Sequence, residues 1–192
     1  MNFFMGNKEE RLVRRLQGGD TVALKDFYSL YADYLTGVCA RYVTDEEDLK
    51  DVFQDALVHI ISHVKDFRYR GTGSLQAWAT RIMVNQSLKY LKERNHHEFA
   101  QLKWDVADED EEEVDDPPVR DIPPEVMQQM IRELPTGYRT VFNLYVFENK
   151  SHQEIADMLG IRKDTSCSQL SRAKNLLAKK ITIYNNSKQQ PR

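Results

Sequence analysis

Apolar residues in the first half of the chain recur at intervals of three and four residues, which is the spacing of one face of a helix. The first such run follows Gly18-Gly19, and Asp20 is placed to begin the helix as its N-cap. Cys39 is expected at the edge of this stripe. The pattern predicts one helix whose buried positions are Phe27, Tyr31, Tyr34, Leu35, Val38 and Tyr42.

Two more helices are expected before residue 98. Thr44 and Glu47 have the T-x-x-E spacing of a capping box, so a second helix should begin there and run to about Val64. Its apolar positions are Val52, Ala56, Leu57, Ile60 and Ile61. After the glycines of "FRYRGTGS", Ser74 is expected to cap a third long helix that ends near His96-His97. The residues expected to face inward from this helix are Leu75, Trp78, Ile82 and Leu91.

The second half of the chain is also periodic, and its last part has the spacing of a helix-turn-helix. Ser151 and Glu154 form a capping box, an apolar face follows, and Gly160 supplies a sharp turn before a second helix. The inward positions of these two helices are Ile155, Ala156, Leu159, Leu170, Ala173 and Leu177. The apolar positions that precede them are Val126, Met130, Leu134, Tyr138, Val141, Phe142 and Tyr145.

Short or flat hydrogen-bonding side chains are expected on the surface of that second helix. They are of the kind that contacts base edges and phosphates. From Ile161 to Arg192 the chain holds eight Lys or Arg against one acid, so this part has the charge of a phosphate-binding segment. A solvated charged face is the alternative. The side chains concerned are Thr165, Ser168, Gln169, Ser171, Arg172 and Asn175.

The two periodic halves are separated by an acidic, proline-containing stretch. Residues 105–121 hold ten carboxylates and one arginine, a net charge of −9, so the rest of the −3 chain carries +6. This stretch has no apolar stripe and is typical of a solvated linker. The expected fold is all-α, with two small helical domains joined by a flexible acidic linker. The expected bounds are 8–97 for the first domain, 98–122 for the linker, 123–184 for the second domain and 185–192 for a disordered tail.

Composition excludes several classes of protein. Hydrophobic residues at 41% and charged residues at 30% fit soluble globular domains and exclude a disordered chain. Neither a run of roughly 18 apolar residues nor the apolar centre of a secretion signal is evident, so no membrane insertion and a cytoplasmic location are expected. Cys39 and Cys167 lie far apart, which indicates reduced thiols and neither a disulfide framework nor a zinc site.

No enzymatic chemistry is expected from the side chains. His59 and His63 are four residues apart and would be able to share a metal, but "HIISH" lacks the Glu of a zinc hydrolase and a third ligand is not evident. Neither a nucleophile–base pair nor a glycine-rich phosphate loop is present. We therefore expect no cofactor, no metal site and no catalytic residue.

Three segments, in this order, resemble the extracytoplasmic-function (ECF) group of bacterial RNA polymerase sigma factors. "DVFQDALVHIISHVKDF" is similar to the second-region helix, and "GSLQAWATRIMVNQSLKYLKER" is similar to the segment with Trp, then Arg-Ile-x-x-Asn, then a basic end. "LPTGYRTVFNLYVFENKSHQEIADMLGIRKDTSCSQLSRAKNLL" resembles the fourth-region helix-turn-helix almost throughout. The resemblance implies a protein that binds core RNA polymerase, recognises two promoter elements, duplex and melted, and helps to open the duplex.

The resemblance also implies partners and contacts on the polymerase. These are the beta-prime clamp and the beta flap, with an anti-sigma factor as a further partner. Six acids crowd the start of the second helix, and stabilisation of the helix dipole is the alternative role for them: Asp45, Glu46, Glu47, Asp48, Asp51 and Asp55. The residues expected to bind polymerase are Asp48, Asp51, Val52, Gln54 and Asp55.

For the minus-ten element, Phe67 and Asn85 are implied to border a pocket for one base flipped from the non-template strand. Aromatic residues beside arginines suit stacking on unpaired bases. The alternatives are a core position for Phe67 and a plain surface amide for Asn85. The full expected set is Phe67, Arg68, Tyr69, Arg70, Trp78, Arg81, Asn85, Lys89 and Lys92.

For the minus-thirty-five element, two residues depart from the usual family pattern. Arg162 stands where a small capping residue is common, and Cys167 stands where a basic residue is common. Cys167 would be a small contact residue or a reactive thiol, and the inert form is favoured without a neighbouring base. The expected set is Arg162, Lys163, Thr165, Cys167, Ser168, Gln169, Ser171 and Arg172.

Other functions are compatible with parts of this pattern. One is a two-domain helix-turn-helix regulator that acts without polymerase, and another is a metal enzyme built on Asp55, His59 and His63. The acidic linker is expected to act either as a stand-in for nucleic acid in basic polymerase channels, displaced as RNA grows, or as a plain tether.

Overall fold

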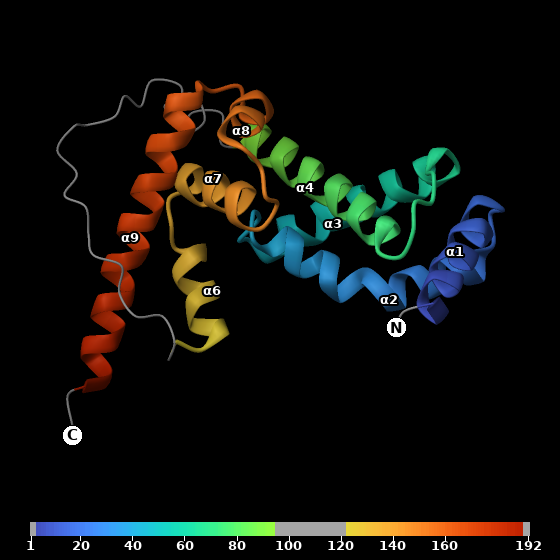
Figure 1. Cartoon of the computed structure of the whole chain (residues 1–192), viewed down its shortest axis with the longest axis horizontal. Helices are drawn as coiled ribbons and strands as arrows, with labels where there is room; N and C mark the ends of the chain where they lie inside the picture. Colours follow the sequence, from blue (N-terminus) through green and yellow to red (C-terminus); the bar gives the residue numbers. More distant parts are fainter. Residues whose placement is uncertain (1–2, 95–121, 190–192) are drawn as a thin grey trace. The chain divides into compact units, whose positions relative to one another are not determined.

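The computed structural model describes residues 3–94 and 122–189, and all of the regular secondary structure in these ranges is helical (Figure 1). The chain divides into two compact units that part between Glu93 and Arg94. The expected all-α fold with two helical domains is confirmed. The linker expected at 98–122 and the domain end expected at His96-His97 lie outside the described residues, apart from Ile122. No described helix combines the length and the apolar character that a bilayer crossing requires.

The described part of the first unit contains one α-helix and one short 3₁₀ helix more than the periodicity predicted. It consists of α1 (Phe3–Gln17), α2 (Thr21–Ala40), α3 (Glu46–His63), the short 3₁₀ helix η1 (Val64–Asp66) and α4 (Ser74–Arg94). Helix α1 was missed because charged residues dominate "KEERLVRRL". Its buried residues nevertheless follow helical spacing, and they are Glu9, Leu12, Val13 and Leu16.

Two aspartates begin helices in the first unit. Asp20 caps α2 as expected, because its side chain accepts hydrogen bonds from the backbone N–H of Val22 and Ala23. The expected Thr44 capping box is wrong. Asp45 is the N-cap of α3, and its Oδ1 accepts from the backbone N–H of Glu47 and Asp48, each at 3.0 Å. An aspartate one position later makes the bonds assigned to the threonine, so the helix begins one residue further on.

The core of the first unit differs in detail from the expected stripes. Cys39 is fully buried, not at an edge, and its Sγ lies 3.7 Å from the Ser87 Oγ. Burial raises the pKa of this thiol. Trp78 and Ile82 are only half-buried, because α4 packs through a stripe containing small residues that let it approach α2. The apolar members of that stripe are Leu75, Ala79, Met83, Val84, Leu88 and Leu91. On α3, Ile61 is exposed.

The start of α4 is held by a residue from another helix. Ser74 does not act as expected, since its Oγ accepts from the Arg70 N–H at 3.2 Å. Instead Glu9 of α1, only 8% exposed, accepts from the N–H of Gly73 at 2.6 Å and of Leu75 at 2.7 Å. Hydrogen bonds to an ionised group contribute about 1.5–3 kcal/mol each, and the helix dipole adds to the attraction. Glu9 therefore joins α1, the loop before α4 and α4 itself.

The second unit consists of α6 (Pro124–Arg132), α7 (Thr136–Val146), α8 (His152–Leu159) and α9 (Lys163–Gln189). The expected disordered tail is wrong for residues 185–189, because α9 continues through them, and residues 190–192 lie outside the described part. Just before this extension, α9 is held to the unit by buried Ile181 and by an ion pair of 2.6 Å between Lys180 and Glu133 of α6. Figure 1 shows α6 and α7 alongside this long helix.

The helix-turn-helix is built as its sequence indicated. Ser151 and Glu154 form both halves of the capping box, and Gly160 ends α8 in the left-handed conformation with φ of 70°. Hydrogen bonds from Ser151 and Lys150 lower the pKa of the Glu154 carboxyl to about 2. The inward positions are confirmed as buried, and they are Ile155, Ala156, Leu159, Leu170, Ala173 and Leu177.

Candidate nucleic-acid interface

The outer face of α3 carries a small acidic surface with an apolar residue beside it. Asp51, Gln54 and Asp55 are exposed, as expected for a docking surface. Val58, one turn further on the same face, is 64% exposed and was missed by the sequence interpretation. The sequence did contain a signal for Val58, because a residue seven positions after Asp51 lies on the same side of a helix.

The remaining residues expected at the polymerase surface have other roles. Val52 is buried in the core of the first unit, so its side chain is not available to a partner. Asp48 is half-buried, and with Glu46 and Glu47 it occupies the first turn of α3. Acids there stabilise the positive end of the helix dipole. The alternative role therefore fits the first-turn acids, whereas Asp51 and Asp55 stand clear of it.

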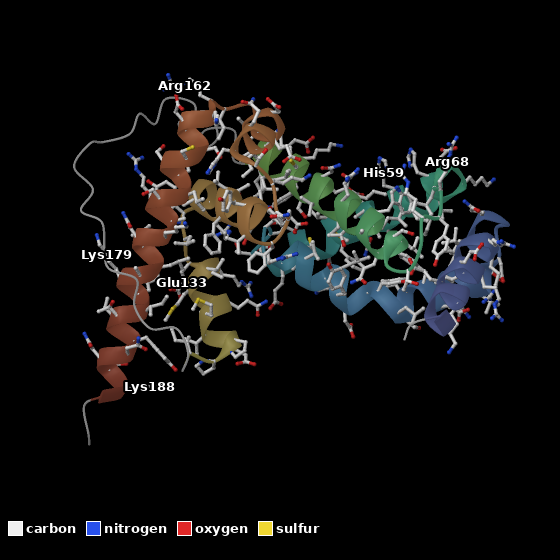
Figure 2. All side chains as sticks on the ribbon, in the orientation of Figure 1. His59, Arg68, Glu133, Arg162, Lys179 and Lys188 are labelled. Atoms are coloured by element: carbon white, nitrogen blue, oxygen red, sulfur yellow. The ribbon has the colours of Figure 1, made fainter. Side chains whose placement is uncertain are left out.

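The loop between η1 and α4 presents aromatic rings beside arginines. The rings of Phe67 and Trp78 pack with centroids 4.9 Å apart at 37°, and both side chains are half-buried. Arg68, which Figure 2 labels on this loop, and Arg70 are exposed, and Tyr69 is half-buried. Phe67 is thus neither a core residue nor a free surface residue. Partly exposed aromatic faces with neighbouring guanidinium groups are suited to stacking bases and holding phosphates.

One exposed stripe runs along α4 from this loop. It consists of Arg81, Asn85, Lys89 and Lys92, which lie within an arc of about 80° and span about 16 Å of the helix. Trp78 precedes them on the same side of the helix, and its contact with Phe67 joins the stripe to the loop. The structure therefore brings the expected minus-ten residues together on one surface.

A second stripe of the same spacing lies on α9. Lys163, Cys167 and Ser171 are exposed at every fourth residue, and Arg162, labelled in Figure 2, is exposed just before them. Lys174 continues this stripe and was missed, although its position three residues after Ser171 was a usable signal. Ser168 is half-buried, and its Oγ donates to the Thr165 carbonyl at 3.0 Å.

Three residues expected on this surface are buried instead. The exposed fractions are 2% for Thr165, 0% for Gln169 and 7% for Arg172. They fall in the half of α9 that packs on α7 and α8, together with Ala173 and Leu177. These residues were expected to be exposed because they are polar. Their spacing along the helix, however, places them on the same side as the core residues. They support α9 from inside its own unit.

His152 connects the helices that carry the second stripe. Its ring stacks on Tyr145 at the end of α7, with centroids 4.9 Å apart, and its Nδ1 lies 3.0 Å from the Ser166 Oγ of α9. Burial lowers the pKa of His152, and the charges of Lys163 and Lys174 lower it further. Both lysines of the α9 stripe therefore disfavour protonation of His152 at the start of α8.

The histidines of α3 do not assemble a larger cluster. The rings of His59 and His63 stack with centroids 4.2 Å apart, and the His63 Nδ1 lies 2.8 Å from the His59 carbonyl oxygen. Within residues 3–94 and 122–189, no group of three or more His, Cys, Asp or Glu is arranged to hold a metal ion. Cys167 is exposed and Cys39 buried, and both are free thiols.

The chain matches two family descriptions in the order of its two units. "Sigma-70 region 2" matches residues 27–97, and "Sigma-70, region 4" matches residues 125–177, so the two together cover more than half of the chain. The chain belongs to the sigma-70 family. The sigma factor is 27% identical over 183 residues to the RNA polymerase sigma-H factor of Pseudomonas aeruginosa, covering 91% of this chain and 94% of that one.

An ECF sigma factor is among the similar proteins. The chain is 26% identical over 185 residues to the ECF RNA polymerase sigma-E factor of Haemophilus influenzae, covering 90% of this chain and 95% of that one. It is also similar to CnrH, solved in complex with the cytosolic domain of CnrY, with a TM-score of 0.48, 21% identity and coverage of 90% and 96% of the two chains. The protein is an ECF sigma factor that directs promoter recognition by RNA polymerase, and it is not an enzyme.

The lowered pKa of His152 makes the second unit sensitive to acid. A histidine whose folded pKa lies below its ordinary value of 6.5 contributes stability above that pH, and the contribution is lost as the pH falls through the folded value. We expect hydrogen-exchange protection of α8 and α9, corrected for intrinsic rates, to decline as the pH falls below about 6.5.

The matched variant is His152→Phe, which keeps a ring against Tyr145 and removes the titration. Its protection should depend less on pH than that of the parent. An equally steep decline in both proteins would show that the acid sensitivity arises from other groups.

Proposed function

We propose that three exposed surfaces of the sigma factor divide the steps of initiation among them. The outer face of α3 binds the polymerase, the η1–α4 loop with the α4 stripe binds the melted minus-ten strand, and the α9 stripe binds the minus-thirty-five duplex. The observation that carries this proposal is the continuous surface of aromatic, guanidinium, amide and ammonium groups from Phe67 to Lys92. Groups that stack on bases and groups that hold phosphates occur together there, as single-strand recognition requires.

The α3 face fits a basic partner surface. Asp51 and Asp55 supply charge that steers association, and Val58 supplies apolar area that becomes buried in a complex. We assign this face to the beta-prime clamp of core polymerase. An anti-sigma factor that restrains the protein would cover the same face. Because its polymerase and promoter partners are cytoplasmic, the sigma factor acts in the cytoplasm.

A second polymerase contact is proposed at the end of α7. Tyr145, Val146 and Phe147 form an exposed apolar run, and exposed apolar patches mark interaction surfaces. The beta flap is the partner that we assign to this run. Two modest contacts on separate units would then act together through their tether.

At the minus-ten element, the order of events follows from the chemistry of the groups. A base must leave the stack before Phe67 and Trp78 can contact its face and before the Asn85 amide can bond its edge. Arg81, Lys89 and Lys92 hold the backbone of the same strand. Recognition is therefore coupled to melting, because the contacts form only with the unpaired strand.

At the minus-thirty-five element, the target is intact duplex. Helix α9 has the position of the reading helix of a helix-turn-helix, which lies in the major groove. Lys163 and Lys174 would contact phosphates, and Cys167 and Ser171 would face the bases between them. Arg162 lies just before the helix and suits a phosphate or a guanine at the edge of the site.

Reversing the charge of the α3 face should weaken the complex with core polymerase. We expect Asp51→Lys combined with Asp55→Lys to lower affinity at least about tenfold, because both changes place cations against a basic surface. The measurement is fluorescence anisotropy of the labelled sigma factor titrated with core polymerase. The same double variant should weaken binding of an anti-sigma factor.

The control is Asp33→Lys combined with Asp66→Lys, which changes the net charge equally at exposed carboxylates of the same unit outside α3. It should bind like the parent, and both variants should keep the parent's helical circular dichroism. Equal affinity of the α3 variant and the control would remove the clamp assignment.

Substitutions on α4 and α9 should affect different steps. On a promoter selected from random DNA with the parent holoenzyme, Asn85→Ala should reduce permanganate reactivity of the melted region while closed-complex binding stays near the parent value.

Lys163→Ala with Lys174→Ala should weaken closed-complex binding on the same promoter. The salt dependence of binding should fall by about one ion for each phosphate that is no longer neutralised.

The control for Asn85 is Gln86→Ala, which removes the neighbouring amide from a different side of α4. It should leave opening unchanged. If Asn85→Ala weakened closed-complex binding by as much as it weakened opening, recognition by this residue would belong to the double helix.

A further inference from the structure

Helix α1 holds the η1–α4 loop at both of its ends. At the first end, the Gln17 Nε2 donates to the carbonyl oxygens of Val64 at 3.0 Å and Phe67 at 2.8 Å. At the other end, the Glu9 carboxylate accepts from the N–H groups of Gly73 and Leu75. Four hydrogen bonds from two side chains of one helix thus bracket the loop.

The two anchoring side chains are held at a fixed separation. Glu9 and Gln17 are eight residues apart, which is about 12 Å along a helix, and their directions differ by about 80°. Leu12, Val13 and Leu16 between them are buried, so this side of α1 is fixed to the unit by its core. Helix α1 therefore fixes the distance between the two ends of the loop.

Between the anchors, two glycines give the loop backbone freedom, and a local hydrogen bond joins the Arg70 N–H to the Ser74 Oγ at 3.2 Å. Gly71 and Gly73 have φ of 120° and 86°, in a region that glycine enters freely. Arg68, Arg70 and Thr72 are exposed, so they bury little surface that would order the backbone. The backbone hydrogen bonds from Phe67 to Val64 and from Ser74 to Gly71 each span only three residues. The anchors on α1 thus restrict an otherwise adaptable segment.

Tyr31 of α2 lies near both Glu9 of α1 and Tyr69 of the loop. It is half-buried, and its pKa is raised by burial and by the nearby groups Glu9 and Tyr69. Tyr69 of the loop and Glu9 of α1 therefore share one environment.

We propose that Glu9 and Gln17 are positioning residues for minus-ten recognition, which fold the loop into its DNA-binding conformation before DNA arrives. This inference rests on the proposed function of the loop. Neither residue contacts DNA itself. They act by keeping Phe67 against Trp78 and by presenting Arg68, Tyr69 and Arg70 in one arrangement to the unpaired strand.

The physical consequence is a gain in affinity through pre-organisation. A protein whose binding-competent conformation is populated only in part binds with an affinity reduced by that fraction. Loosening either end of the loop should therefore weaken single-strand binding. The outer face of α3 should keep its polymerase affinity, because it is not part of the contacts that α1 makes with the loop.

The test uses two variants that keep side-chain size. Gln17→Glu replaces the donor to two carbonyl oxygens with a carboxylate, and Glu9→Gln replaces one of two accepting oxygens with a donor. Glu10→Gln is the matched control, because Glu10 bonds Arg14 within α1 and does not contact the loop. Gln17 is half-buried, so its variant remains informative even where Glu9→Gln reduces the stability of the unit.

Three measurements are made on each variant. The first is holoenzyme affinity for a short single strand selected from a random-sequence pool on the parent holoenzyme. The second is affinity for core polymerase. The third is the fluorescence of Trp78, in a Trp104→Phe background that leaves it as the single tryptophan, which reports the packing of Phe67 on its ring.

The single-strand affinity of Gln17→Glu and Glu9→Gln should fall by about tenfold, while their polymerase affinity is retained. The Trp78 emission of both variants should change. Glu10→Gln should match the parent in all three measurements. Unchanged single-strand affinity and emission in Gln17→Glu would overturn the proposal. A parallel loss of polymerase and single-strand affinity would also overturn it, since that result means general damage to the unit. Arg70→Ala separates this from the proposed function: if it leaves single-strand binding intact, the loop itself is not the DNA-binding surface.

Discussion

The carboxylate of Glu9 accepts two hydrogen bonds from the start of α4, and the arrangement of the first unit depends on this contact. A buried carboxylate is costly unless hydrogen bonds replace its water, so the backbone at Gly73 and Leu75 has to remain where it can donate. The position of α1 thereby fixes the position at which α4 begins. The position of the residues proposed to face DNA follows from that, because the stripe from Arg81 to Lys92 starts two turns later and Trp78 lies between.

The second unit uses the same principle with the opposite charge. Arg139 is buried, and its Nη1 donates to the carbonyl oxygens of Arg132 at 2.8 Å and Leu134 at 3.1 Å, at the end of α6. A cation at the carboxyl end of a helix and an anion at the amino end both agree with the helix dipole. Each unit therefore joins its helices through a buried ion at a helix end. Each also presents a polar stripe on one long helix, α4 or α9, whose other side belongs to the core.

The sequence predicted most of the features that depend on neighbouring residues, although the N-cap of α3 proved to be Asp45 and not Thr44. The Asp20 cap, the Ser151–Glu154 capping box and the Gly160 turn are each set within a few positions, and all three are present. Features set by distant residues were missed. Glu9 meets Gly73 and Leu75 across more than sixty positions, so Ser74 was the only visible candidate to begin α4. On α9, Thr165 and Gln169 are polar residues used inside the unit, and residue type alone does not distinguish that role from a DNA contact.

On the proposal above, the η1–α4 loop is already folded in the free protein before the melted strand binds it. Residue-resolved hydrogen exchange at the amides of Gly73 and Leu75 tests it most directly, in the free chain and in holoenzyme bound to an unpaired minus-ten strand. We predict slow exchange of both amides in the free chain and little change on binding, since Glu9 already accepts their hydrogen bonds. Rapid exchange in the free chain that becomes slow only with DNA would contradict it, because the loop would then fold on the strand that it binds.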